Sequence, residues 1–386
     1  ESPAEVALFA EDHIIVQIEE DDPKELDEIF RDLRAVDIER IGGSSFFVVH
    51  LPPGEKAHEF VKRADNDVRV LDAGLDYRSS APEGGPSDAP ILGSDLIDSI
   101  PAQMSLAPIG LPGGHALSTG AGVIVAVVDT GIDPGHPFLA GRIAPGGFDC
   151  IDGDPDPIEE LNFIDDDRDG RVDDQFGHGT FVASLVLAAA PDALILPIRA
   201  LDDEGYGNAS TVASAIHWAV ERGAQVINLS VDIEMDPHVV ADAIDFAKER
   251  GVVVVAAAGN AGLPDVVFPA RYSEVLAVAA TDPGGLIAPF SNFGSEIDLA
   301  APGVGMVGAV PQELNPAGTA RWSGTSFATP LVSGVAALVL ALDPGLRPEE
   351  VLSRLAQAAQ PIDDLNPEQE GELGAGLLRA AEALLP

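Results

Sequence analysis

The sequence predicts an α/β fold with a mostly parallel sheet in a three-layer domain over residues 100–386, preceded by a small α+β unit over residues 1–80. The 386 residues are roughly two to three times the length of a typical domain, so more than one folding unit is expected. The order of strand-like and helix-like patterns also changes near residue 120. Between the two parts, residues 81–99 are rich in Pro, Gly, Ser and Asp, a composition typical of an exposed, cleavable linker.

The first 80 residues contain four strand-like and two helix-like patterns. Gly42 and Gly43 separate the second strand pattern from the third and indicate a hairpin. The order β-α-β-β-α-β predicts a ferredoxin-like fold, which by itself fits an independent binding domain. The predicted strands are residues 14–18, 36–41, 45–50 and 68–75, and the predicted helices are residues 23–34 and 55–64.

Continuous Val-, Ile- and Ala-rich runs mark the strands of the C-terminal part. Helical patterns separate several of them, and this alternation is typical of a parallel sheet buried on both faces. Functional groups in such sheets gather at the carboxyl ends of the strands. The predicted strands are residues 123–128, 194–198, 226–229, 252–258 and 275–280, and the predicted helices are residues 181–190, 211–222, 239–250, 326–342, 348–357 and 376–385.

The chain is strongly acidic, with a formal net charge of −43. A negative field of this size repels nucleic acids and anionic membranes, so we expect neither as a partner. Many acidic residues with few lysines are typical of proteins that stay soluble in high salt, and a GC-rich genome explains the same composition equally well. No apolar run approaches the ~20 residues that span a bilayer.

The single cysteine and the first residues bear on localisation. One cysteine excludes an internal disulfide, and Cys150 lacks the histidine context of a nucleophile, so we expect a structural role. The sequence begins at Glu1 with neither a basic nor an apolar leader segment. Either a secretion signal has been removed or none existed, and we expect a secreted, extracellular protein whose signal peptide is already removed.

Three short segments supply the groups that peptide hydrolysis requires: a nucleophile, a base and a group that orients the base. Asp129 ends a predicted strand and precedes a glycine turn, and His178 lies between two glycines before a predicted helix. Ser326 opens a long apolar helix, where the helix dipole favours developing negative charge. Each segment alone is weak evidence, because Asp-Thr-Gly also occurs in aspartic proteases and most serines at helix starts are caps.

Together, in the order Asp, His, Ser, the three segments resemble the subtilisin family over residues 100–386. Residues 257–260 (AAGN) resemble the oxyanion segment of that family, residues 228–230 (NLS) its substrate-binding strand and residues 374–376 (GAG) its C-terminus. The resemblance implies a subtilisin-like fold and a serine endopeptidase that acts on polypeptide substrates. Such an enzyme is expected to need no organic cofactor, and we expect the protein to be a monomer.

The resemblance assigns a role to each matching position. Ser326 is expected to be the nucleophile and His178 the general base and then acid, while Asp129 holds the imidazole tautomer. Asn260 would bind the oxyanion together with the backbone N–H of Ser326. The implied substrate-binding residues are Ser230, Val231, Asp232, Ala258 and Gly259.

Asp232 departs from the family pattern, in which this position is usually glycine. With Glu234 and Asp236 nearby, an acidic pocket would favour basic residues at P1, the substrate residue before the scissile bond. An acidic rim that merely faces solvent fits the same residues equally well. The seven other histidines lie in no comparable motif and are expected to be structural or solvent-facing: His13, His50, His58, His115, His136, His217 and His238.

Residues 165–174 have the spacing of a calcium-binding loop, with Asp at relative positions 1, 3 and 5 and Gly at position 6. Position 12 is Phe176, so the usual bidentate glutamate is missing. We expect a structural calcium ion there, and a solvated acidic loop is the alternative. The extra calcium loop that many subtilisins carry after the histidine helix is expected to be absent. The expected ligands are Asp165, Asp167, Asp169 and Asp173.

Residues 1–80 resemble the subtilisin propeptide in element order and position. The resemblance implies a zymogen, in which this unit acts as folding chaperone and intramolecular inhibitor and is cut off at residues 77–80 or 81–99. A permanent accessory domain is the alternative. Two other functions are alternatives: a catalytically silent peptide-binding module and a nucleotide-binding enzyme. No phosphate-binding loop, which a nucleotide-binding enzyme would need, is evident.

Overall fold

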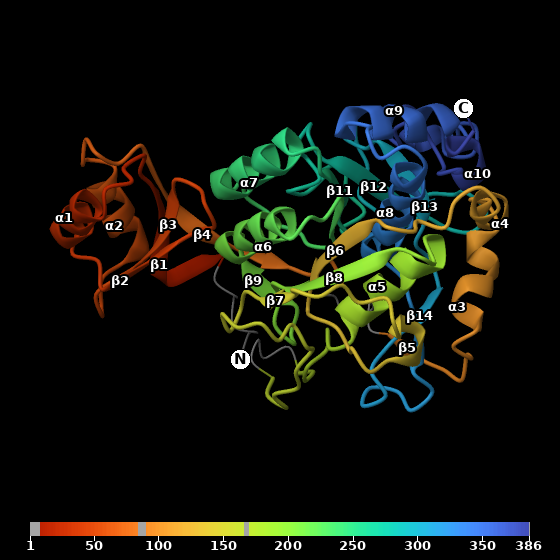
Figure 1. Cartoon of the computed structure of the whole chain (residues 1–386), viewed down its shortest axis with the longest axis horizontal. Helices are drawn as coiled ribbons and strands as arrows, with labels where there is room; N and C mark the ends of the chain where they lie inside the picture. The colour runs from red at the N-terminus through yellow and green to blue at the C-terminus, as the bar shows by residue number, and fades with distance from the viewer. Residues whose placement is uncertain (1–7, 84–89, 166–169, 386) are drawn as a thin grey trace.

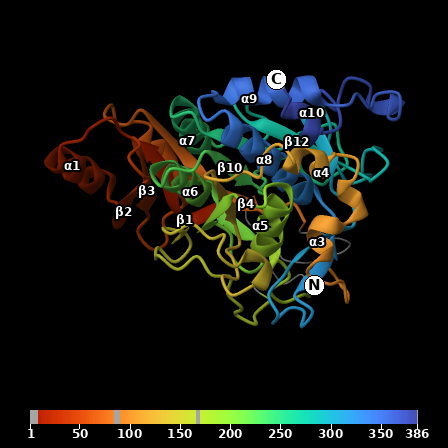
Figure 2. The same cartoon turned by 45° about the vertical axis from the view of Figure 1, so that its right-hand side comes forward.

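The structure is a computed structural model that describes residues 8–83, 90–165 and 170–385. A small N-terminal unit, drawn in red to orange and holding α1, α2 and β1–β4, stands beside a larger body that holds the central sheet (Figure 1). When the molecule is turned, α1 and β2 of the small unit still project from the larger body, while β1 and β4 overlap it in the view (Figure 2). Both belong to classes that the sequence predicts.

The N-terminal unit is an antiparallel sheet with two helices. Its elements follow the predicted order: β1 (Phe9–Gln17), α1 (Pro23–Leu33), β2 (Asp37–Arg40), β3 (Phe46–His50), α2 (Ala57–Ala64) and β4 (Asp72–Ser80). The strands lie in the order β2-β3-β1-β4, as in a ferredoxin-like fold. Helix α1 begins where Asp22 accepts a hydrogen bond from the Lys24 N–H and ends where Arg34 adopts a left-handed conformation. Phe30, Phe47 and Phe60 fill a core that belongs to this unit alone.

The fourth strand lies later in the chain than predicted. Residues 68–71 form turns, and Val68 is 98% exposed. The strand begins at Asp72, because pairing with β1 sets its register, with Leu75 opposite Ile14. An apolar run had indicated residues 68–75, but the partner strand decided which residues are extended.

The larger body is built on a seven-stranded parallel sheet in the order β13-β12-β11-β10-β6-β8-β7. All residues of β10 and β11 are buried, and because neighbouring side chains in a strand point to opposite faces, both faces of the sheet are covered. The strands are β6 (Ile124–Asp129), β7 (Phe148–Asp149), β8 (Leu194–Arg199), β10 (Val226–Leu229), β11 (Val253–Ala257), β12 (Leu276–Thr281) and β13 (Leu299–Pro302).

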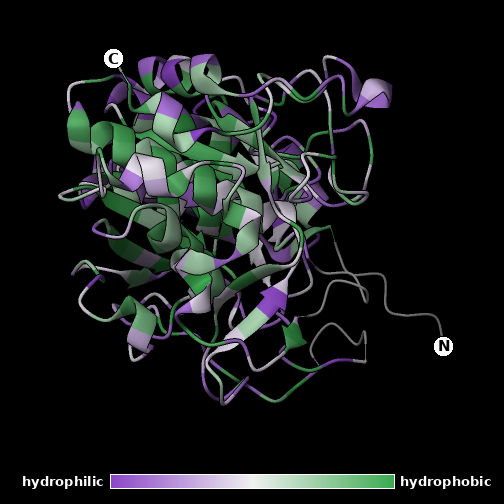
Figure 3. Ribbon diagram, turned by 90° about the vertical axis from the view of Figure 1, so that its right-hand side faces the viewer, coloured by the Kyte–Doolittle hydropathy of each residue, from purple (hydrophilic) through white to green (hydrophobic). Residues whose placement is uncertain are grey.

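Two helix pairs cover this sheet, α5 with α8 and α6 with α7. Helix α8 is long and apolar enough to cross a membrane by length and composition, but 89% of it is buried inside the protein, as expected for a core helix. Hydrophobic residues gather in the sheet and these helices, and hydrophilic ones lie mostly around them (Figure 3). The helices are α5 (His178–Ala189), α6 (Ala209–Glu221), α7 (His238–Glu249), α8 (Thr325–Leu342) and α9 (Pro348–Ala358).

The last predicted helix is much shorter than expected. Only α10 (Ala380–Ala383) is helical, because Leu377 bridges to Ala300 and to Gln360 as a short strand would. Gly374 makes this possible: a Cβ there would lie 2.2 Å from the carbonyl oxygen of Asp298. Short elements that the sequence did not indicate are β5 (Ile91–Leu92), α3 (Ser99–Ala102), α4 (Leu111–His115), β9 (Tyr206–Asn208), β14 (Met306–Ala309), β15 (Thr319–Trp322) and the 3-10 turns Met104–Leu106, Pro137–Leu139 and Pro367–Gln369.

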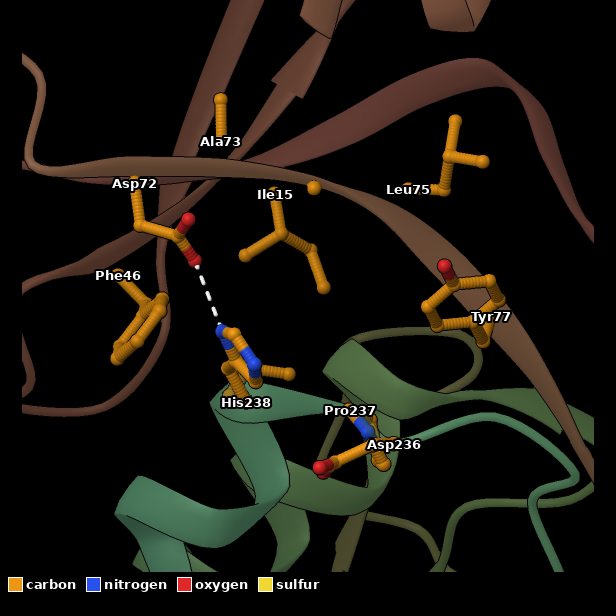
Figure 4. A pocket seen from close by; sticks show the side chains of 11 residues that line it. Ile15, Phe46, Asp72, Ala73, Leu75, Tyr77, Asp236, Pro237 and His238 are labelled. Atoms are coloured by element: carbon orange, nitrogen blue, oxygen red, sulfur yellow. Dashed lines mark hydrogen bonds and ion pairs between the residues drawn. The ribbon is translucent and has the colours of Figure 1, made fainter. Parts of the chain in front are cut away.

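Strand β4 links the two parts of the molecule. It pairs with β1 in the N-terminal sheet and, at its C-terminal end, with β9 of the larger body. Beside it, His238 at the start of α7 lies 3.2 Å from the Asp72 carboxylate, at a small pocket between the two parts (Figure 4). Ala81 and Glu83 are buried, although the linker composition predicted exposure. These residues therefore lie inside the fold, and they continue directly from β4.

Candidate active site

Three residues that lie far apart in the chain meet at the carboxyl edge of the parallel sheet. Asp129 is the last residue of β6, His178 the first of α5 and Ser326 the second of α8. All three are fully buried. The fold therefore brings together the three residues that the sequence predicted to act together.

Asp129 holds one side of the histidine ring. His178 Nδ1 lies 2.6 Å from Asp129 Oδ1, which also accepts a hydrogen bond from the Thr130 N–H at 2.8 Å. Gly179 permits this approach, since a Cβ at that position would lie 2.1 Å from the Gly131 carbonyl oxygen. The contact assigns the Nδ1 proton to the side that faces Asp129, which leaves Nε2 for other chemistry.

A second carboxylate ties the strand that carries Asp129 to the helix that carries His178. Glu159 accepts hydrogen bonds from the Thr130 hydroxyl at 2.9 Å and from the Thr180 hydroxyl at 2.6 Å. The Thr130 hydroxyl in turn accepts from the Gly179 N–H at 3.0 Å. Burial raises the pKa of Glu159 to about 7, and the threonine hydrogen bonds oppose that rise. The network fixes the distance between Asp129 and His178.

The opposite side of the ring faces Glu83, which comes from the segment after β4. Glu83 Oε2 lies 3.1 Å from His178 Nε2 and accepts a hydrogen bond from Ser326 Oγ at 2.7 Å. Glu83 is fully buried. Its carboxylate therefore joins the serine and the histidine, in the place where a direct serine–histidine hydrogen bond would act.

The other oxygen of Glu83 is bound by the donors expected to stabilise an oxyanion. Glu83 Oε1 lies 2.8 Å from Asn260 Nδ2 and 3.3 Å from the backbone N of Ser326. Asn260 is held by its own Oδ1, which accepts from the N–H and the hydroxyl of Thr325 at 2.9 Å each. Gly324 leaves the necessary space, because a Cβ there would lie 1.8 Å from Glu83 Oε1. The carboxylate thus contacts both donors that the sequence predicted for an oxyanion.

The residues before Glu83 run through the cleft as an added strand. On one side, Arg78, Ser79 and Ser80 pair antiparallel with β9. On the other side, Ser80 and Asp232 exchange two backbone hydrogen bonds, of 3.0 and 2.8 Å. Ala81 N–H then donates to the Gly205 carbonyl at 2.8 Å. This is the backbone pairing by which a sheet edge binds an extended peptide.

The predicted substrate-binding residues line this region. Ser230 Oγ lies 3.2 Å from the carbonyl oxygen of Ser326, and the Gly259 N–H lies 3.3 Å from the Thr325 hydroxyl. Val231 and Ala258 are buried. The structure thus places Ser230 and Gly259 beside the serine or the residue before it, and Asp232 pairs with Ser80.

The Asp232 side chain contacts the bound segment as well as its backbone. Its Oδ1 accepts a hydrogen bond from Ser80 Oγ at 2.6 Å. Burial raises the pKa of Asp232 to about 6; the Ser80 hydrogen bond opposes this, and the charges of Glu83 and Glu234 add to it. Asp232 therefore faces the third residue before Glu83.

Two neighbouring carboxylates determine the direction in which the pKa of His178 is shifted. Burial alone would lower the pKa of His178, but the charges and hydrogen bonds of Asp129 and Glu83 outweigh it and raise the pKa to about 10. The ring is protonated at neutral pH in this arrangement. A protonated ring donates from both nitrogens, to Asp129 and to Glu83, and cannot accept a proton from Ser326.

Part of the predicted calcium loop is described. Asp165 Oδ1 is buried with no hydrogen-bond partner within the described ranges, while Asp173 accepts from the Phe163 N–H at 3.1 Å. Asp173 also faces Asp203, whose pKa is raised to about 7 by burial and by a hydrogen bond to Asp173. The paired carboxylates of Asp173 and Asp203 supply oxygen atoms of the kind that Ca²⁺ prefers, but among the described residues they do not form a group of three ligands within 4.8 Å of one another. Asp167 and Asp169 lie outside the described residues.

Two residues of this site were not predicted from the sequence. Glu83 falls in a segment whose composition indicated only a linker, and Glu159 lies in an acidic, turn-rich stretch. Neither carries a local signal, because both act through contacts with residues far away in the chain. Cys150 agrees with the structural role expected, since burial raises the pKa of its thiol to about 12.

The subtilase family model matches residues 120–376. Thermitase of Thermoactinomyces vulgaris is 38% identical over 241 residues, which cover 60% of this chain and 79% of thermitase. Subtilisin Savinase of Lederbergia lenta is 36% identical over 274 residues, 69% of this chain and 91% of that protein. A thermophilic serine proteinase of Bacillus sp. strain AK1 is 39% identical over 229 residues, but this chain spans only 52% of its length.

A solved structure extends the likeness to the N-terminal unit. Fervidolysin of Fervidobacterium pennivorans, described as a keratinolytic enzyme related to subtilisin, aligns with a TM-score of 0.78 and 25% identity. The alignment covers 97% of this chain and 61% of fervidolysin. Together with the family match over two thirds of its residues, this shows that the chain belongs to the subtilase family of serine proteases.

Proposed function

We propose that this protein is a serine endopeptidase in its zymogen form, inhibited by its own N-terminal part. In this proposal residues 1–80 are the pro-domain, residues 81–99 the segment in which it is cut, and residues 100–386 the catalytic domain. One observation carries the proposal: the Glu83 carboxylate bonds to Ser326 Oγ, His178 Nε2 and Asn260 Nδ2 at the same time. A segment that contacts all three groups excludes any substrate from them.

Once this segment leaves, the site is arranged for acyl transfer. Ser326 Oγ attacks the carbonyl carbon of the scissile peptide bond and gives its proton to His178 Nε2, while Asp129 stabilises the resulting imidazolium. Asn260 Nδ2 and the Ser326 N–H donate to the oxyanion. His178 then protonates the leaving amine as the C–N bond breaks. Water, deprotonated by the same histidine, hydrolyses the acyl-enzyme and restores Ser326.

Backbone pairing supports broad cleavage of polypeptides. A substrate that follows the path of residues 78–81 gains affinity from main-chain hydrogen bonds to β9 and to Asp232, and these bonds are independent of side-chain type. Side-chain preference then depends on the pockets beside the strand. A preference for basic P1 residues stays a proposal that Arg and Phe peptides differing only at P1 test, although Asp232 itself contacts Ser80, three residues before Glu83.

The decisive experiment compares the purified chain with Ser326→Ala by mass spectrometry and by fluorophosphonate labelling. We expect the parent chain to cut itself within residues 81–99 and then to label at Ser326. The Ser326→Ala variant should remain whole and unlabelled, whereas Ser353→Ala, which removes an exposed serine on α9, should behave like the parent. A chain that stays whole and unlabelled with Ser326 present would point instead to a silent peptide-binding module.

The carboxylates around residues 165–174 support a structural calcium ion. Asp173 and Asp203 contact each other, and Asp165 Oδ1 is buried without a partner among the described residues, so these carboxylates would supply oxygen ligands once the loop closes around an ion. The loop precedes α5, which carries His178. The ion would neutralise repulsion between these carboxylates and hold the loop before His178 in place. Secretion, a monomeric state and the absence of an organic cofactor complete the proposal.

A further inference from the structure

A group of metal-binding side chains lies in the N-terminal unit, far from the catalytic residues in the chain. Strands β1 and β3 pair so that His13 lies directly opposite His50, with ring centroids 5.3 Å apart. Asp12 approaches the same position, and its Oδ1 lies 2.8 Å from His13 Nδ1. One ligand atom from each of the three residues lies within 4.8 Å of the others.

The second nitrogen of His13 is already bound in the way that metal-ligating histidines show. His13 Nε2 lies 2.8 Å from Oδ2 of Asp76, which is fully buried. A histidine that binds a metal through one nitrogen usually donates its other N–H to a carboxylate, which fixes the tautomer and the ring orientation. Asp76 is itself held by the N–H and the hydroxyl of Ser210 at the start of α6.

This tautomer leaves two acceptors facing each other. If Nε2 carries the proton that bonds to Asp76, the lone pair of His13 Nδ1 points at the Asp12 carboxylate, 2.8 Å away. Two acceptors at that distance need a cation between them. A proton satisfies this need, and so does a metal ion, which would also use the imidazole of His50 on the facing strand.

We propose that Asp12, His13 and His50 bind a divalent transition-metal ion of the zinc class. Two imidazoles and one carboxylate suit Zn²⁺, Cu²⁺, Ni²⁺ or Co²⁺, whereas Ca²⁺ and Mg²⁺ prefer oxygen ligands alone. Bonds of about 2.0–2.1 Å place tetrahedral ligand atoms about 3.3 Å apart, so modest side-chain shifts complete the site. The Asp12 side chain is 81% exposed and therefore free to move, and water supplies the fourth ligand.

The position of the site gives the ion a structural effect. It would clamp β1 to β3 and orient His13 toward Asp76, the carboxylate that connects the N-terminal sheet to α6 of the larger body. Because the ion binds the folded unit and not the unfolded chain, it raises the stability of the N-terminal unit. This inference does not depend on the proposed proteolytic activity.

The test uses the full-length Ser326→Ala chain, which cannot cut itself, freed of metal and kept in excess Ca²⁺ to occupy carboxylate clusters. Calorimetric titration with Zn²⁺ should show one site, and titration with Cu²⁺ should give an electron paramagnetic resonance signal with coupling to two nitrogens. His50→Asn and Asp12→Asn should weaken Zn²⁺ binding at least ~10-fold, the lower end of the effect of losing a single supporting contact.

His58→Asn is the matched control. His58 lies on α2 of the same unit and contacts the Phe9 ring edge-to-face, so its loss removes an imidazole without touching the site. We expect this variant to bind Zn²⁺ like the parent. Equal Zn²⁺ affinity in the His50→Asn and His58→Asn variants, or a Cu²⁺ signal with oxygen ligands alone, would overturn the proposal. A thermal unfolding scan of each variant, recorded without metal, checks that the variant is folded.

Discussion

Glu83 Oε2 accepts a hydrogen bond of 2.7 Å from Ser326 Oγ, across 243 residues of chain. The same oxygen lies 3.1 Å from His178 Nε2, and its partner oxygen is bound by Asn260. A single side chain therefore bonds to Ser326, His178 and Asn260 at the same time, and its carboxylate lies among donors that the sequence predicted for an oxyanion. Inhibition and catalysis in this proposal draw on the same hydrogen-bond donors.

Replacement of this carboxylate should release the serine. In the uncleaved chain, Glu83→Gln removes the charge that pairs with His178, and we expect fluorophosphonate labelling of Ser326 to be about 10-fold faster, since a charged hydrogen bond contributes roughly 1.5–3 kcal/mol. Mass spectrometry restricts the measurement to molecules of full mass. Glu313→Gln, at an exposed glutamate, is the control and should label like the parent. Equal rates for all three proteins would show that Glu83 does not restrain Ser326.

The titration of His178 should report the same contact. Its pKa is raised to about 10 by Asp129 and Glu83, so the protonated ring contributes stability fully below pH 6.5, and that contribution is lost as the pH rises through about 10. We expect Glu83→Gln, in the Ser326→Ala background, to lower the pKa of His178 in an NMR titration. The Asp129 contact remains in that variant and keeps the ring in place. An unchanged titration curve would contradict the assignment.

Glu159 is predicted to act as a positioning residue. Glu159→Gln keeps the shape of the side chain but weakens its bonds to the Thr130 and Thr180 hydroxyls, so we expect the processed enzyme to lose kcat by about 10-fold with little change in KM, as for an interaction that aligns the reacting groups. A change confined to KM would argue against this role.

The same variant should alter the pH dependence of stability. The pKa of Glu159 is raised from 4.5 to about 7, so the folded chain holds a proton that the unfolded chain has lost, and the free energy of unfolding falls as the pH rises from 4.5 to 7. The full effect is about 3 kcal/mol for this fully buried group. Glu159→Gln in the Ser326→Ala chain should remove that slope in urea unfolding at pH 5 and pH 7.5. If the free energy of unfolding still falls with pH in this variant, the titration of other carboxyl groups causes the fall.

Asp232 is predicted to select a hydroxyl three residues before the position of Glu83. Asp232 Oδ1 accepts from Ser80 Oγ, so peptides with Ser at the equivalent position should be cleaved about 3- to 10-fold faster than peptides with Ala, as expected for one hydrogen bond with a net contribution of roughly 0.5–1.5 kcal/mol. In Asp232→Gly the two peptides should become equal. The ratio of kcat/KM values for the peptide pair measures this. Glu234→Gln changes a neighbouring exposed acid and should retain the preference.

Removal of calcium should loosen the loop before His178. If Asp165, Asp173 and Asp203 hold the ion, chelation leaves their charges unscreened, and we expect the melting temperature of the Ser326→Ala chain to fall by several degrees. Asp173→Asn should make the protein insensitive to the chelator. Asp343→Asn, at an exposed residue beyond α8, is the control. A melting temperature that chelation leaves unchanged would remove calcium from the proposal.

The amino-acid sequence by itself determined the classes of both folding units and predicted three residues that the fold brings together. Local patterns carry this information: buried strands are continuous apolar runs, and Asp129, His178 and Ser326 each lie at the end of a strand or the start of a helix. The first residue of a strand was harder to predict where pairing with another strand sets it, as at β4, whose register depends on β1.

Only the tertiary structure decided what fills the active site. Residues 81–83 have a linker composition, and nothing local distinguishes Glu83 from the other acidic residues of a chain with net charge −43. Its role depends on the path of β4 between β9 and Asp232, which delivers the carboxylate to Ser326. The pairing of His13 with His50 likewise depends on strand register. Contacts between distant residues are set by packing and register, and a local sequence pattern does not encode them.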